Sequence, residues 1–134
     1  MIYLLDTNIC IAIIKNCPPE VKKKMLQTSV GEIAISSIVL AELWYGVELS
    51  EKQTENRAAL YDFLQYVVVL DWPEQASREY GKIRAHLKKK GAPIGANDLF
   101  IAAHALALNA ILISDNAREF SRIPELELEN WIAR

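Results

Sequence analysis

The first eight residues constrain the fold of this chain more than any other stretch. Residues 2–5 form an apolar run whose length suits a fully buried β-strand, and the run stops abruptly at the polar residues 6–8. A largely apolar helical pattern follows over residues 9–14. A buried strand that leads through a polar turn into a buried helix is typical of a parallel α/β sheet. Because such sheets carry their chemistry at the carboxyl ends of their strands, Asp6 is a candidate site residue.

Asp6 also has a plain structural interpretation, as the N-cap of the helix that follows it. The same arrangement recurs later in the chain, where the apolar run 110–113 ends in the polar residues 114–116. This recurrence favours a shared polar edge at the ends of two strands over an isolated helix cap.

The rest of the sequence alternates between predicted strands and helices. We expect further strands at residues 32–36, 66–70 and 126–128, of which the second, with three consecutive valines, is expected to be buried. Further helices are expected at residues 20–27, 38–47, 53–65, 73–90, 98–108 and 117–121. This alternation predicts an α/β fold in which a mostly parallel sheet of four to five strands lies between helices in an α/β/α sandwich. Residues 1–134 are expected to form one domain.

Local signals refine this outline. Ser36 or Ser37 is expected to cap the third predicted helix, and Asn97 is expected to cap the sixth. The third and fourth predicted helices are joined by a short polar turn and are expected to form a hairpin. Trp131 is expected to close the end of the sheet.

The composition limits the classes of function. The formal net charge of −2 does not indicate a nucleic-acid binder, so a polyanionic substrate would need a local basic patch or bound cations. Two cysteines are too few for a disulfide scaffold, and no Cys/His spacing suggests zinc. The sequence shows neither a signal peptide nor an apolar stretch long enough to cross a membrane. We therefore expect a cytoplasmic protein.

Acids and amides from four places are expected at one edge of the sheet: Asp6, Glu42, Asp98, and the pair Asp115 and Asn116. Each has an ordinary alternative, since Glu42 can point to solvent and Asp98 suits the first turn of its helix. Carboxylates that crowd together without a cation repel one another and raise one another's pKa. A divalent metal relieves that repulsion, and oxygen ligands favour Mg²⁺ or Mn²⁺ over zinc. Such a site is equipped for phosphodiester hydrolysis.

The best basic patch lies in the second half of the predicted helix 73–90. Its candidates for contact with nucleic acid are Arg84, Lys88, Lys89 and Lys90. Cations in the last turn also complement the negative end of the helix dipole. The two interpretations, dipole compensation and phosphate binding, are compatible.

These residues resemble the PIN-domain ribonucleases and, among them, the VapC-type toxins of bacterial toxin–antitoxin pairs. The matching motifs span nearly the whole chain in the family's order and spacing: Leu5-Asp6-Thr7-Asn8, Ser36-Ser37, Ala41-Glu42-Leu43-Trp44-Tyr45-Gly46, Ile94-Gly95-Ala96-Asn97-Asp98, Ile101-Ala102-Ala103-His104-Ala105, Ile113-Ser114-Asp115-Asn116 and Arg118-Glu119-Phe120. The resemblance implies a PIN fold and an Mg²⁺- or Mn²⁺-dependent endoribonuclease. It also implies a homodimer and inhibition by a VapB-like antitoxin whose C-terminal segment wraps the toxin. The implied substrate is a structured tRNA, such as the anticodon stem-loop of initiator tRNA.

The resemblance also implies roles for single residues. Asp6, Glu42 and Asp98 would bind metal, and the hydroxyl groups of Thr7 and Ser114 would orient ligands or water.

One departure from the family pattern concerns its fourth acid, which is replaced here by Asn116. Asp115 stands one residue earlier, and Glu119 is close enough in sequence to compensate for the missing charge. Asn8 completes the set of supporting residues. The resemblance therefore leaves open whether one metal or two would bind.

Two alternatives to the nuclease remain. One is a catalytically weak PIN fold that only binds RNA or a protein, which the missing fourth acid favours and the intact trio of Asp6, Glu42 and Asp98 opposes. The other is a nucleotide-binding or phosphatase-like α/β domain. The sequence lacks its glycine-rich phosphate loop, and Asn8 stands where a second aspartate is expected.

Overall fold

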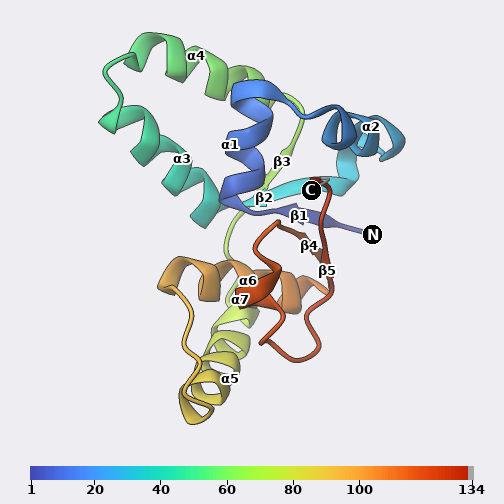
Figure 1. Cartoon of the computed structure of the whole chain (residues 1–134), viewed down its shortest axis with the longest axis vertical. Helices are drawn as coiled ribbons and strands as arrows, with labels where there is room; N and C mark the ends of the chain where they lie inside the picture. The colour runs from blue at the N-terminus through green and yellow to red at the C-terminus, as the bar shows by residue number, and fades with distance from the viewer. Residues whose placement is uncertain (133–134) are drawn as a thin grey trace.

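A parallel sheet forms the centre of the molecule across residues 1–132, which the computed structural model describes (Figure 1). The last two residues of the expected domain 1–134 lie outside this range. The strands are β1 (Tyr3–Leu5), β2 (Ile33–Ser36), β3 (Val68–Leu70), β4 (Ile111–Ile113) and β5 (Leu128–Glu129). Their order in the sheet is β3-β2-β1-β4-β5, and every pairing is parallel. The carboxyl ends of the central strands β1 and β4 therefore lie side by side.

Helices cover the sheet from two sides, which confirms the predicted α/β/α arrangement (Figure 1). They are α1 (Thr7–Asn16), α2 (Pro19–Gln27), α3 (Ser37–Leu49), α4 (Gln53–Leu64), α5 (Gln75–Lys89), α6 (Ala96–Leu108) and α7 (Ala117–Phe120), with a short 3₁₀ turn at Val30–Glu32. In Figure 1, α1, α3 and α4 lie on one side of the sheet, and α5 and α6 lie on the other. No helix within residues 1–132 is both long and apolar enough to cross a membrane.

The core lies where these helices meet the inner strands. All four residues of β2 are buried, as expected for a parallel strand that is covered on both faces. Helix α6 is buried along most of its length, and its alanines allow close packing against the sheet and α5. The expected hairpin of α3 and α4 is present, with Trp44 packed edge-on against Tyr61. Trp131 is buried against Tyr3, as expected.

The prediction that β3 is a buried strand is wrong. Val68 is 39% exposed and Val69 is 38% exposed, because β3 is the edge strand and pairs with β2 alone. A run of β-branched residues favours a strand, but it does not show whether the strand is central or at an edge.

The predicted cap of α6 is also wrong. The helix begins at Ala96, so Asn97 lies in its first turn, exposed, and Gly95 occupies the cap position without a side-chain hydrogen bond. The backbone carbonyl of Gly95 still accepts the first helical hydrogen bond, from Leu99. For α3, Ser36 is the cap, and its hydroxyl accepts a hydrogen bond from the N–H of Ile38. The last strand lies at 128–129, slightly later than the expected 126–128.

Candidate active site

Asp6 and Ser114 meet at the carboxyl ends of β1 and β4. The N–H of Asp6 donates to the carbonyl of Ile113, the last residue of β4, at 3.0 Å. The Ser114 hydroxyl donates a hydrogen bond to the Asp6 carboxylate and accepts one from the N–H of Asn116 at 2.9 Å. Both side chains are buried. The parallel register of the two strands thus joins residues that are far apart in the sequence.

Both interpretations of Asp6 are met in the structure. Its Oδ1 accepts a hydrogen bond of 2.9 Å from the N–H of Ile9 and so caps α1. Its other neighbours belong to the polar edge of the sheet, because its pKa responds to Ser114, Asp115 and Glu42. One carboxylate therefore starts a helix and also belongs to the acidic cluster.

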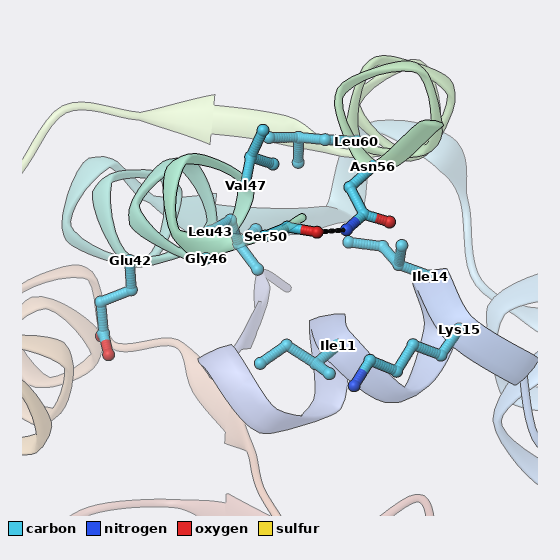
Figure 2. Close-up of a pocket in the computed structure, with 10 residues that line it drawn as sticks. All are labelled: Ile11, Ile14, Lys15, Glu42, Leu43, Gly46, Val47, Ser50, Asn56 and Leu60. Carbon is cyan, nitrogen blue, oxygen red and sulfur yellow. Dashed lines mark hydrogen bonds between the residues drawn. The ribbon is translucent and has the colours of Figure 1, made fainter. Parts of the chain in front are cut away.

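Glu42 reaches this edge from α3. The hydroxyl of Thr7, the residue after Asp6, donates a hydrogen bond of 2.9 Å to Oε1 of Glu42. Figure 2 shows the Glu42 carboxylate pointing away from the apolar side chains that line the neighbouring groove. The alternative in which Glu42 points freely to solvent is therefore wrong.

Asp98 and Glu119 form the opposite part of the cluster. Asp98 lies half-buried in the first turn of α6 and shares a hydrogen bond with the side chain of Glu119, in α7. The Asn116 amide donates to Oε2 of Glu119 at 3.3 Å. Asn116, which stands where the family often has an acid, thus holds the carboxylate of Glu119 by this hydrogen bond.

The electrostatics of the cluster are those of crowded carboxylates. The pKa of Asp6 is raised to about 6, mainly by burial and further by the charges of Asp115 and Glu42, against the hydrogen bonds from Ser114 and Ile9. The pKa of Asp98 is also raised to about 6, by burial first and then by Glu119, Asp6 and Glu42. Every charged group that shifts either pKa is itself a carboxylate.

The donor set fits a hard divalent cation. Carboxylates with mutually raised pKa values are stabilised by a cation, and oxygen ligands favour Mg²⁺ or Mn²⁺. Within residues 1–132, no three acidic, histidine or cysteine side chains already stand close enough together to enclose an ion. Some of these side chains would therefore have to turn inward for an ion to bind. Asp6, Glu42 and Asp98 are the candidates to hold it.

The remaining predicted residues divide into two groups. Asn8 is exposed on the first turn of α1. Lys89 and Lys90, at the C-terminal end of α5, are exposed as well. Arg84 and Lys88 line a cavity between α5 and the segment that leads into α6. The four basic candidates therefore do not form one equivalent set.

Sequence reasoning missed a structural role for Trp72. Its backbone N–H donates to the hydroxyl of Ser37 at 3.0 Å, and its indole N–H donates to the carbonyl of Phe100 at 2.8 Å. Its ring also packs edge-on against Phe100, with ring centroids 5.5 Å apart. Trp72 thus ties the starts of α3 and α6 together beside the acidic cluster. No local pattern in the sequence signals these long-range contacts.

An apolar groove of about 340 Å³ adjoins the cluster (Figure 2). It lies between α1, α3 and α4, and its lining residues are Ile11, Ile14, Lys15, Glu42, Leu43, Gly46, Val47, Ser50, Asn56 and Leu60. Because Glu42 belongs to both the groove and the cluster, whatever fills the groove lies next to the candidate active site.

Comparison with known proteins gives consistent results. The family model described as PIN domain matches residues 3–126. The chain is 48% identical over 132 residues to Ribonuclease VapC2 of Rickettsia felis, covering 98% of each chain. It is 40% identical over 129 residues to the tRNA(fMet)-specific endonuclease VapC of Shigella flexneri, covering 96% of this chain and 97% of that protein.

A solved structure agrees with these sequence relatives. The crystal structure of VapBC2 from Rickettsia felis bound to a DNA fragment from their promoter contains a chain with a TM-score of 0.93 and 45% identity. The match covers 98% of this chain and 100% of that one. The chain described here therefore belongs to the PIN domain family and, within it, to the VapC group.

Proposed function

We propose that this chain is a toxin of the VapC type, an endoribonuclease that hydrolyses RNA phosphodiester bonds with the help of Mg²⁺ or Mn²⁺. The observation that carries the proposal is that the carboxylates of Asp6, Glu42 and Asp98 lie within electrostatic range of one another at the carboxyl edge of the sheet, with the pKa of both aspartates raised to about 6. The names of the relatives, ribonuclease and endonuclease, support the same activity.

Asp6, Glu42 and Asp98 would hold the cation, and Asn116, Asp115 and Glu119 would complete the site. A divalent cation held there would supply an activated water and electrostatic stabilisation for hydrolysis of the phosphodiester, and the expected products are a 5′-phosphate and a 3′-hydroxyl.

The other contacts of the site hold these ligands in place. The Ser114 hydroxyl and the Ile9 N–H fix the Asp6 carboxylate, and Thr7 fixes Glu42. Burial and the neighbouring carboxylates raise the pKa of Asp6 and of Asp98 to about 6, so protons compete with a cation for these two groups at lower pH. Activity is therefore expected to fall as the pH drops below about 6.

The proposed substrate is a structured tRNA, such as initiator tRNA. The relative from Shigella flexneri is named as a tRNA(fMet)-specific endonuclease, which supports this choice. Arg84, Lys88 and Lys89 of α5, with Lys90 directly after the helix, are exposed and offer positive charge for phosphate contacts in a chain of net charge −2.

The proposed regulator is a VapB-like antitoxin. The structural relative from Rickettsia felis was solved as VapBC2, and the apolar groove beside Glu42 offers a surface on which such a partner can dock. Toxin homodimers in the cytoplasm belong to the same proposal. Tyr45, which is 65% exposed on α3, is one side chain that such an interface can use.

The test is cleavage of total tRNA and of a generic single-stranded RNA by the purified chain, with Mg²⁺, Mn²⁺ or EDTA. Discrete fragments that require the metal and vanish in Asp6→Asn support the nuclease. A folded chain, free of antitoxin, that cleaves neither RNA with either metal would instead support the RNA- or protein-binding module.

A further inference from the structure

A second cavity lies between α5 and the segment that leads into α6. Its volume is about 380 Å³, which falls in the range of roughly 300–1,000 Å³ that is typical of small-ligand sites. Helix α5 contributes a polar wall that includes Tyr80, Arg84 and Lys88, and the opposite wall is apolar, with Pro93 and Ile94. The cavity thus combines positive charge on one wall with an apolar wall opposite.

Planar side chains are grouped at the polar wall. The rings of Tyr80 and Phe100 are stacked, with centroids 4.6 Å apart and planes 17° apart. The guanidinium carbon of Arg84 lies 5.8 Å from the centroid of Tyr80, and its Nη1 donates a hydrogen bond of 2.9 Å to the Tyr80 hydroxyl. Arg84 is exposed, yet its planar head is held in place by the ring beneath it. Arginine planes and aromatic rings are the surfaces on which proteins stack unpaired bases.

This group is anchored to the framework of the sheet. Trp72, directly beyond β3, packs against Phe100 and hydrogen-bonds its carbonyl, and it also binds Ser37 at the start of α3. The stacking surface is therefore organised before any ligand arrives, which lowers the entropic cost of binding.

The cavity adjoins the acidic cluster through a few residues. Ile94 and Ala96 line the cavity, while a Cβ placed on Gly95, between them, would lie 3.8 Å from Oδ2 of Asp98. Phe100 follows Asp98 by two residues in α6. A nucleotide strand that presents a phosphodiester to Asp98 therefore has an adjacent base within reach of the cavity.

Building on the proposed ribonuclease function, we propose that this cavity receives one unpaired base of the RNA substrate next to the bond that is cleaved. Arg84 stacks on the base, and Lys88 neutralises a neighbouring phosphate. A base held in a duplex cannot enter such a cavity, so the site favours nucleotides in loops or single strands. Lys89 and Lys90, which do not line the cavity, contribute only to the general electrostatic attraction.

Two variants test the cavity, and a third serves as a matched control. Arg84→Lys keeps the charge but removes the planar group, and Ile94→Trp fills the cavity while keeping every charge. Arg78→Gln removes one charge from an exposed position of the same helix, outside the cavity. The probes are total tRNA for cleavage and a set of single-stranded RNAs that carry 2-aminopurine at successive positions, whose fluorescence falls when that base stacks. Circular dichroism melts check that each variant folds.

We expect Arg84→Lys to raise the KM for tRNA about tenfold, the effect of losing one stacked base, without changing the salt dependence of binding. Fluorescence quenching at one probe position is expected in the wild-type chain and is lost in Arg84→Lys and Ile94→Trp. Arg78→Gln is expected to change KM by about twofold or less and to keep the quenching.

A wild-type chain that cleaves tRNA while both cavity variants match it in KM and quenching overturns this inference alone. A KM that rises as much in Arg78→Gln as in the two cavity variants also overturns it, because the loss would then not depend on the cavity. A wild-type chain that neither cleaves tRNA nor quenches any probe overturns the proposed function and this inference together.

Discussion

Thr7 donates a hydrogen bond of 2.9 Å to the carboxylate of Glu42, which lies 35 residues later in the chain. The bond joins the first turn of α1 to α3, so the residue that directly follows Asp6 orients a second acid of the cluster. If Glu42 binds metal as proposed, the Thr7 hydroxyl acts on the site through Glu42, and supporting contacts of this kind affect metal affinity and rate.

Replacing Thr7 with valine is therefore expected to weaken the site without removing an acid. Thr7→Val keeps the shape of the side chain but leaves Glu42 without its donor, and we expect a 10- to 100-fold higher metal requirement or lower cleavage rate, the order usual for supporting contacts. Titration of tRNA cleavage with Mg²⁺ and Mn²⁺ measures both the metal requirement and the cleavage rate. Thr7→Ser, which retains the hydroxyl, is the control, and a serine variant as impaired as the valine variant would contradict the assignment.

Removing a carboxylate from the cluster is expected to abolish cleavage. Asp6→Asn and Asp98→Asn should each lower the rate by about 10²-fold or more, because each removes a charge that is proposed to bind the cation. The asparagine at position 6 can still accept the hydrogen bond from Ile9, so α1 keeps its cap. Glu48→Gln, at an exposed position of α3, is the control and should cleave like the wild type. Single-turnover cleavage of tRNA provides the measurement.

The same variants are expected to stabilise the metal-free fold. The folded-state pKa of Asp6 is about 6, above its ordinary value of 3.8, so the folded chain retains protons that the unfolded chain releases between pH 4 and 6. Stability from this group is therefore highest below pH 4 and falls as the pH rises through 6. In EDTA at pH 7, Asp6→Asn should raise the free energy of unfolding by about 1–3 kcal/mol, and Asp98→Asn by less because Asp98 is half-exposed.

Urea unfolding in EDTA at pH 4 and pH 7 measures this effect. The gain for Asp6→Asn should be close to zero at pH 4, where the aspartic acid is neutral, and should appear at pH 7. Added Mg²⁺ should stabilise the wild type more than the variant. A variant that is less stable than the wild type at pH 7 would show that burial does not penalise this carboxylate.

The polar edge of the sheet could be predicted from sequence because it follows from parallel topology. Asp6 and Ser114 end adjacent parallel strands, and apolar runs that stop at polar residues indicate such ends without any knowledge of packing. The hydrogen bond between Thr7 and Glu42 could not be predicted, because it depends on the distance between two helices.

Environment, rather than residue type, explains what sequence reasoning missed. Val68 and Val69 have the composition of a central strand, yet the sheet ends at β3 and leaves them part-exposed. Arg84 and Lys88 look equivalent to Lys89 in the sequence, but only the first two face the cavity. The spacing of Tyr80 and Arg84, four residues apart on one helix, was a usable signal for their contact.

Ser114 provides a test of the pKa argument that does not remove an acid. The hydrogen bond from the Ser114 hydroxyl lowers the pKa of Asp6. Ser114→Ala deletes this donor, so the pKa of Asp6 should rise further and the acid limb of the cleavage profile should move to higher pH. Ser36→Ala is the control, because Ser36 is also a buried serine at the end of a strand, where its hydroxyl caps α3. Its loss should cost about 1 kcal/mol of stability and leave the pH profile unmoved. Rate–pH profiles on tRNA compare the two.

Gly46 allows the groove to be filled with little disturbance of the fold. It lies in α3 among the groove residues, and a Cβ added there meets nothing within 4 Å. Gly46→Leu should therefore place an apolar side chain in the groove, and it should stabilise α3 slightly because leucine is a better helix former than glycine. We expect the variant to cleave RNA like the wild type but to bind a VapB-like antitoxin at least tenfold more weakly, since the groove is no longer free.

Gly81 supplies the matched control for this change. It lies in α5, outside the groove, and a Cβ added there also meets nothing within 4 Å. Gly81→Leu makes the same chemical change in a helix and should leave inhibition by the antitoxin intact. Titration of tRNA cleavage with antitoxin compares the two variants. Equal inhibition of both would show that the antitoxin docks elsewhere, whereas selective escape of Gly46→Leu would place it in the groove beside Glu42 and explain inhibition by its nearness to the acidic cluster.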